Sequence, residues 1–179
     1  MQHTLIALVE DKPGVLNRVS SLFRRRAFNI DSLAVGHTDR PGISRMTIVM
    51  DSDNVSAERV TSYLYKLVNV IQVEDVTHRP TVSRDLAMIK VGVSATNRTE
   101  IIQLVDVFRA RIVDVANDSM IVEITGDEEK INGFVDVLRP YGIMEMVRTG
   151  TVSMLRGAVT PANGGNGHHN GNGKNGKII

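Results

Sequence analysis

The chain has 179 residues, 42% of them hydrophobic and 23% charged, which is the composition of an ordinary globular protein. Its 21 Lys and Arg residues nearly balance its 20 Asp and Glu residues, so the formal charge of +1 provides no overall field to recruit nucleic acid or anionic lipid. No apolar run reaches the roughly 20 residues of a membrane helix, and the absence of cysteine excludes disulfides and thiolate chemistry. We therefore expect no nucleic-acid and no membrane partner, and a cytoplasmic location because "MQHTLIALVED" enters a strand-like run without a targeting segment.

The first part of the chain predicts six elements in the order strand, helix, strand, strand, helix, strand. The strand "TLIALV" is followed by a helix with apolar residues at helical spacing, and Pro13 lies in the first turn of this helix. The run "IDSLAVGHT" and the alternation in "SRMTIVMD" predict two strands joined by the turn "DRPG". A second helix carries Val60 and Leu64 on one face, and "VIQVEDVTH" is the last strand. We assign these elements to a domain spanning residues 1–78.

The same order recurs after a polar stretch, "RPTVSRD", which we interpret as a linker over residues 79–85. The strand "LAMIKVGV" leads to a helix that begins near Asn97, and the strands "IVDVA" and "MIVEIT" flank a short turn. A last helix begins near Asp127 and is followed by the strand "IMEMVRT". We predict an α+β protein of two tandem βαββαβ ferredoxin-like domains, the second over residues 86–157, with a disordered Gly- and Asn-rich tail over residues 158–179.

No catalytic or metal-binding constellation is evident in the ordered part. Its only histidines, His3, His37 and His78, lie outside any recognisable nucleophile or zinc motif. His168 and His169 lie in the Gly- and Asn-rich tail, where two ligands on a floppy segment make a weak metal site. We therefore expect no catalytic residue and no bound metal on this chain.

The turn in "EDKPGVLNRV" is the strongest candidate for a ligand site. Pro13 fixes the backbone and Gly14 has no side chain, so the amides at the start of the helix can approach the carboxylate of a small ligand. Asp11 is a candidate partner for a ligand ammonium group, and Asn29 offers both a donor and an acceptor. Apolar neighbours favour an aliphatic ligand side chain; they are Val15, Leu16 and Ile30. The pieces suit an amino acid, although the Pro-Gly pair also has a purely structural interpretation as a strand-to-helix turn.

An enzymatic interpretation of the same turn is an acylphosphatase-like site. Such phosphate-binding loops end in Gly-Val-x-x-Arg, which Gly14, Val15 and Arg18 match. The carboxylates of Glu10 and Asp11 would repel a phosphate, so we regard this alternative as the weaker one.

Four stretches of the chain resemble a known family. "EDKPGVLNRV", "FNIDSLAVGHTD" and "SRMTIVM" resemble the amino-terminal ACT domain of the small, regulatory subunit of acetolactate synthase, also called acetohydroxyacid synthase. "VRTGTVSMLRG" resembles the carboxy-terminal segment of that subunit, so the resemblance covers about residues 2–157.

The resemblance implies a non-catalytic subunit of a transferase complex in valine, isoleucine and leucine biosynthesis. In this family the small subunit activates a thiamine-diphosphate-dependent large subunit and confers feedback inhibition by valine or a related branched-chain amino acid. The resemblance places thiamine diphosphate, Mg²⁺ and FAD on the large subunit and no cofactor on this chain. It also implies a homodimer.

The resemblance further implies that the effector sits where two ACT domains meet. The turn of one chain and the second strand of the other contact it, and the matching effector-binding positions are Asp11, Gly14, Val15, Leu16, Asn29 and Ile30. Some members of the family have Asn where this chain has Asp11, whose carboxylate would attract the ligand ammonium and repel its carboxylate. The second domain lacks an equivalent Pro-Gly turn, and we assign it to contact with the large subunit or to dimer support. The alternative in another class is a stand-alone ACT-domain amino-acid sensor that regulates a different protein.

Overall fold

The structure is a computed structural model that describes residues 2–51 and 57–157. The Gly- and Asn-rich tail predicted over residues 158–179, with His168 and His169, lies outside the described residues. Within these ranges no helix is long and apolar enough to cross a membrane.

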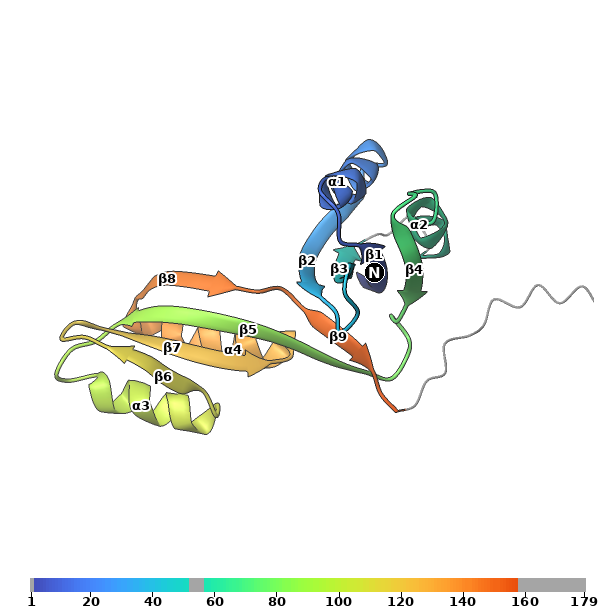
Figure 1. The fold of residues 1–179 in the computed structure, drawn as a ribbon. Helices are drawn as coiled ribbons and strands as arrows, with labels where there is room; N and C mark the ends of the chain where they lie inside the picture. Colours follow the sequence, from blue (N-terminus) through green and yellow to red (C-terminus); the bar gives the residue numbers. More distant parts are fainter. Residues whose placement is uncertain (1, 52–56, 158–179) are drawn as a thin grey trace, which may run out of the picture.

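The first unit is a four-stranded antiparallel sheet with two helices on one face (Figure 1). Its elements are β1 (Gln2–Glu10), α1 (Val15–Arg25), β2 (Asn29–His37), β3 (Ile43–Asp51), α2 (Ala57–Leu64) and β4 (Val70–Asp75). The strand order is β2-β3-β1-β4, and alternate residues of β1, Leu5, Ala7 and Val9, join a core with Val19 and Phe23 of α1. Apolar residues recur every second position in the strand and every fourth position in the helix, and this spacing is the pattern that predicted the elements.

The second unit repeats this arrangement around a separate core. Its elements are β5 (Thr81–Gly92), α3 (Arg98–Val107), β6 (Arg111–Val115), β7 (Ser119–Gly126), α4 (Glu128–Leu138), the 3₁₀ turn η1 (Arg139–Tyr141), β8 (Ile143–Arg148) and β9 (Val152–Leu155). The strand order is β6-β7-β5-β8, with β9 paired to the start of β5. Ile89, Ile101 and Phe134 are fully buried in this core. The two sheets, each with helices on one face, confirm the predicted α+β fold class.

Most of the linker predicted over residues 79–85 forms a β-strand in the structure. Residues 81–85 are the beginning of β5, and Thr81 and Arg84 pair with Leu155 and Val152 of β9. The polar composition of "RPTVSRD" indicated a loop, but the partner strand lies some 70 residues later in the chain, so no local pattern reveals the pairing. This long strand and β9 form a two-stranded ribbon that reaches from the second unit to the first (Figure 1).

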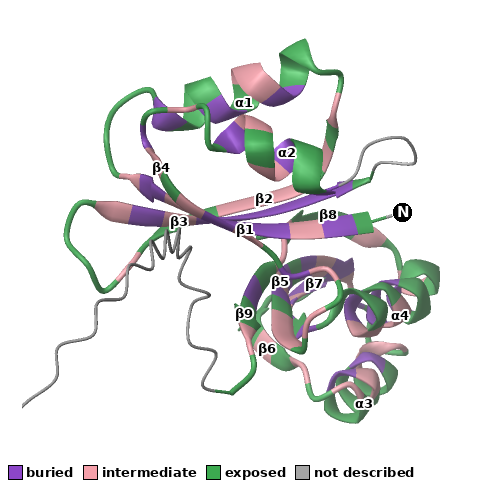
Figure 2. Ribbon diagram, turned by 90° about the vertical axis from the view of Figure 1, so that its right-hand side faces the viewer, coloured by how far each residue is buried: buried purple, intermediate pink, exposed green. Residues whose placement is uncertain are grey.

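The face of the first sheet that points away from α1 and α2 is covered by the second unit. Ile6, Thr47 and Val49 on this face are only 3 to 4% exposed. Figure 2 shows the two helices on one side of the sheet and the carboxy-terminal unit on the other. β9 of the ribbon faces this side of the sheet, where Met154 and Leu155 line a cavity together with Ile6. The contact between the units therefore buries one face of the sheet that carries the candidate effector residues.

Candidate functional site

The Pro-Gly turn leaves the start of α1 open. Gly14 is the N-cap residue of α1 with φ +85°, a left-handed conformation that favours glycine. Within the described residues no side chain caps this helix, and no atom beyond the chain neighbours would lie within 4 Å of a Cβ at Gly14. The amides of Leu16 and Asn17 donate to no acceptor in the described part of the chain. Two backbone donors at the positive end of an 11-residue helix are thus available to a small anion.

A chain of hydrogen bonds fixes the turn against the sheet. Asn69 donates from Nδ2 to Glu10 Oε2 at 2.6 Å, and Arg18 donates from Nη1 to Asn69 Oδ1 at 2.5 Å. The hydrogen bond from Asn69, and then that from Lys12, lowers the pKa of Glu10. Arg18, which an acylphosphatase-like site would use for phosphate, is therefore engaged with Asn69, and a carboxylate stands beside the turn. Both observations argue against the enzymatic alternative.

Asp11 has a partner that sequence reasoning missed. His37, the last residue of β2, places Nδ1 3.3 Å from Asp11 Oδ2, and both side chains are exposed. The two residues are 26 positions apart. They come together because β1 and β2 both pair antiparallel with β3 and so run in the same direction, which places the end of β2 near the end of β1. A protonated His37 would offset the negative charge of Asp11 at the mouth of the turn.

The other candidate residues lie at the opposite end of the sheet. Asn29 is opposite Asp51, which pairs with Gln2 at the start of β1, whereas His37 is opposite Ser44 near the end of β1. Eight residue steps at about 3.3 Å separate the two ends of β2 by ~26 Å. One copy of the chain therefore does not bring Asn29 and Ile30 to the turn that carries Asp11, Gly14, Val15 and Leu16.

The candidate residues differ in what they can offer to a ligand. Val15 is buried in the core, so it can contribute only its backbone, whereas the side chain of Leu16 is 46% exposed beside the open amides. Ile30 is partly buried against the same core, and Asn29 donates from Nδ2 to Asp31 Oδ1 at 2.8 Å. β2 is the terminal strand of its sheet, so one of its edges is unpaired in the described chain.

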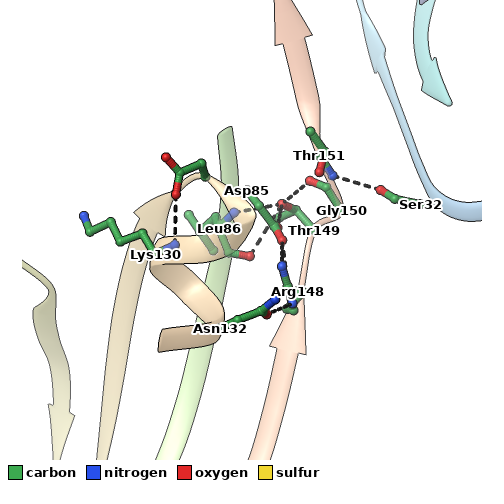
Figure 3. Close-up of polar contacts among 10 residues, drawn as sticks. Ser32, Asp85, Leu86, Lys130, Asn132, Arg148, Thr149, Gly150 and Thr151 are labelled. Atoms are coloured by element: carbon green, nitrogen blue, oxygen red, sulfur yellow. Dashed lines mark hydrogen bonds and ion pairs between the residues drawn. The ribbon is translucent and has the colours of Figure 1, made fainter. Parts of the chain in front are cut away.

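A second polar cluster lies where the two units meet (Figure 3). Asp85 is 3% exposed and accepts hydrogen bonds from Arg148 Nε at 2.8 Å and from Thr149 Oγ1 at 3.1 Å. Across the junction, the Thr151 amide donates to Ser32 Oγ of β2 at 2.9 Å. These residues line a cavity of about 400 Å³. The segment "RTGT", which is part of the stretch that resembles the family, therefore joins β8 to β9 and contacts the first unit at Ser32.

The described residues contain no group of three or more His, Asp or Glu side chains that could hold a metal ion.

Two family models together match most of the described chain. A model described as the ACT domain of AHAS small-subunit-like proteins matches residues 5–72, and one described as the small subunit of acetolactate synthase matches residues 84–157. The stretch between the two matches, residues 73–83, runs from the end of β4 in the first unit to the beginning of β5 in the second.

Similar proteins carry the same description. The chain is 52% identical to a probable acetolactate synthase small subunit of Archaeoglobus fulgidus over 157 residues, which is 88% of this chain and 98% of that one. It is 52% identical to the acetolactate synthase small subunit of Mycolicibacterium smegmatis over 155 residues, 87% of this chain and 91% of the other. Among solved structures, the acetolactate synthase small subunit from Thermotoga maritima matches with a TM-score of 0.83 and 39% identity, covering 89% of this chain and 99% of that one.

Proposed function

The chain belongs to the family of acetolactate synthase small subunits, and from this premise we propose that it activates the catalytic large subunit and makes that subunit sensitive to valine. Thiamine diphosphate, Mg²⁺ and FAD then belong to the large subunit, and the complex works in the cytoplasm. The effector is valine or a related branched-chain amino acid, bound between two copies of this chain.

The main support for a site between two chains is that its two groups of residues lie at opposite ends of β2. Asn29 and Ile30 lie at one end, and the turn that carries Asp11 lies beside the other end. In an antiparallel pair of β2 strands centred on Leu33, residue 29 of one copy faces residue 37 of the other. Asn29 of the second copy then lies beside His37, which already contacts Asp11 next to the turn. The unpaired edge of β2 supplies the backbone donors and acceptors for this pairing. The dimer thus assembles two equal sites that a single chain lacks.

The chemistry of each assembled site suits an aliphatic amino acid. The amides of Leu16 and Asn17 hold the carboxylate at the helix start, and Asp11 attracts the ammonium group. The exposed side chain of Leu16 and Ile30 of the second copy provide an apolar surface for a branched side chain.

Regulation follows from differential binding. Valine that bridges the two copies stabilises one arrangement of the dimer, and the large subunit must bind the other arrangement better. By reciprocity, the large subunit in its active form then weakens valine binding by the same factor.

The test is a substitution at Gly14 in the reconstituted complex. Gly14→Asp adds a carboxylate where the ligand carboxylate is bound. We expect the valine concentration for half-maximal inhibition to rise about tenfold or more, because charge-assisted hydrogen bonds are lost and repulsion is added. Activation without valine should remain.

Gly142→Asp is the control for adding a carboxylate at a glycine of positive φ. Gly142 has the same φ of +85° as Gly14, with a ψ of +94° in place of −6°. Like Gly14 it has no atom beyond its chain neighbours within 4 Å of the place that a Cβ would occupy, but it lies in the second unit. Gly14→Asp with unchanged valine inhibition would contradict the proposed site. Valine binding by a chain that does not alter the large subunit would instead indicate the stand-alone sensor.

A further inference from the structure

Ser32 lies two residues after Ile30, the last candidate effector residue of β2. The register between β2 and β3 shifts between Ile30 and Ser32, so Asp31 forms a bulge in the strand. Beyond this bulge the hydroxyl of Ser32 accepts a hydrogen bond from the Thr151 amide, 119 residues later in the chain (Figure 3). Only one residue therefore separates the proposed effector contact at Ile30 from a contact with the carboxy-terminal unit.

The segment that contacts Ser32 is attached firmly to the second unit. Thr149 accepts a hydrogen bond from the Leu86 amide at 3.1 Å and donates to Asp85 Oδ1. The preceding Arg148 binds the buried carboxylate of Asp85 and also donates from Nη1 to Asn132 Oδ1 on α4 at 3.0 Å (Figure 3). A displacement of residues 149–151 would thus have to move or break contacts with both β5 and α4.

The fit between the two units at this point is close. Gly150 has φ +80°, and a Cβ added there would lie 2.5 Å from Ser32 Oγ, well inside van der Waals contact. A second bond spans the junction on the neighbouring strand, where Arg45 Nη2 donates to the Ser153 carbonyl oxygen at 2.5 Å. The two contacts hold the beginning of β9 against β2 and β3.

We propose that Ser32 is a positioning residue that transmits effector binding on β2 to the carboxy-terminal unit, through its hydrogen bond to Thr151 and its close fit against Gly150. This inference rests on the proposed function and specifies how its site acts. An effector that draws Asn29 and Ile30 toward a second copy shifts the bulge, and Ser32 carries that shift to residues 149–151. The carboxy-terminal unit is held by these residues and changes its position relative to the first sheet.

The test separates valine binding from valine inhibition. Ser32→Ala removes the acceptor, and Gly150→Ala forces the two units apart. For each variant, calorimetry measures the valine affinity of the chain alone, and acetolactate production measures inhibition of the complex. We expect the affinity of the chain alone to stay within about twofold, whereas the valine concentration for half-maximal inhibition rises about fivefold or more, the lower end of typical allosteric coupling.

Two control variants match the two perturbations. Gly142→Ala adds a methyl group at another glycine of positive φ, +85°, with nothing within 4 Å of the added Cβ beyond its chain neighbours and so no contact across the junction. Ser83→Ala removes a hydroxyl that lies 2.8 Å from Ser153 Oγ within the ribbon of β5 and β9. Both controls should be inhibited by valine as the unmodified chain is.

The outcomes distinguish this inference from the proposed function. The transmitting role of Ser32 is refuted, and the proposed function stands, if valine inhibits the unmodified complex and the Ser32→Ala and Gly150→Ala complexes at the same half-maximal concentration. If either variant loses affinity in the chain alone by as much as it loses inhibition, Ser32 belongs to the binding site and transmits nothing. A complex of the unmodified chain that valine does not inhibit refutes the proposed function itself.

Discussion

Replacing Arg148 with methionine should destabilise the second unit by leaving a buried charge without its partner. The Asp85 carboxylate is 3% exposed, and Arg148 contacts it with Nε and Nη2 while remaining 28% exposed itself. After Arg148→Met, the hydroxyl of Thr149, at 3.1 Å, is the one side-chain donor that this carboxylate keeps among the described residues. Breaking a buried ion pair from one side costs about 3–5 kcal/mol, and we take the lower end because the guanidinium is partly hydrated.

The exposed ion pair of Arg139 and Asp136 provides the comparison. Their side chains are 69% and 70% exposed at a separation of 3.0 Å, so Arg139→Met should cost no more than about 1 kcal/mol. A loss of about 3 kcal/mol in a unit of this size lowers the melting temperature by ~12–24 °C. Urea unfolding followed by circular dichroism measures both variants. Equal losses below about 1 kcal/mol would refute the claim that the pair at the junction is buried and interdependent.

Asp11→Asn should lower the affinity of the chain for valine, since a neutral amide oxygen replaces the carboxylate that accepts from the ligand ammonium; calorimetry would contradict this if the affinity rose. Glu10→Gln should alter the pH dependence of stability. The pKa of Glu10 is lowered in the folded chain by Asn69 and Lys12, so its contribution is present above the unfolded pKa and is lost as the pH falls through the folded pKa. Thermal unfolding from pH 7 to pH 3 should show the variant less stable at pH 7 and the difference shrinking as the pH falls, and a constant difference would contradict the assignment.

The elements of both units could be predicted because their signals are local. In β1 the alternation of Leu5, Ala7 and Val9 marks the core face, and in α1 Val19 and Phe23 recur at helical spacing. A repeated order of elements then indicated the fold class without any knowledge of long-range contacts.

The contacts that join the units could not be predicted, because they connect residues far apart in the sequence. The Ser32–Thr151 and Arg45–Ser153 bonds span 119 and 108 residues. The first uses the hydroxyl of Ser32 and the second the guanidinium of Arg45, and no sequence motif around either residue indicates such a contact. The strand pairing at the start of β5 was missed for the same reason, since polar residues in a two-stranded ribbon resemble a loop.

Some features of the candidate site follow from the sequence, and others needed the fold. Gly14 and the open helix start follow from "DKPGV", and the structure shows the positive φ that a glycine there implies. The Asp11–His37 contact depends on the register of β2 and needed the fold. The pairing of Asn29 with the turn of a second copy stays a prediction, derived from the resemblance and from the position of the two ends of β2.

The central claim is tested most directly by the rate of acetolactate production by the cognate large subunit, alone and with this chain, each with and without valine. The account predicts that the chain raises the rate and that valine removes the gain only when the chain is present. An unchanged rate at saturating amounts of the chain would contradict the regulatory function proposed for it.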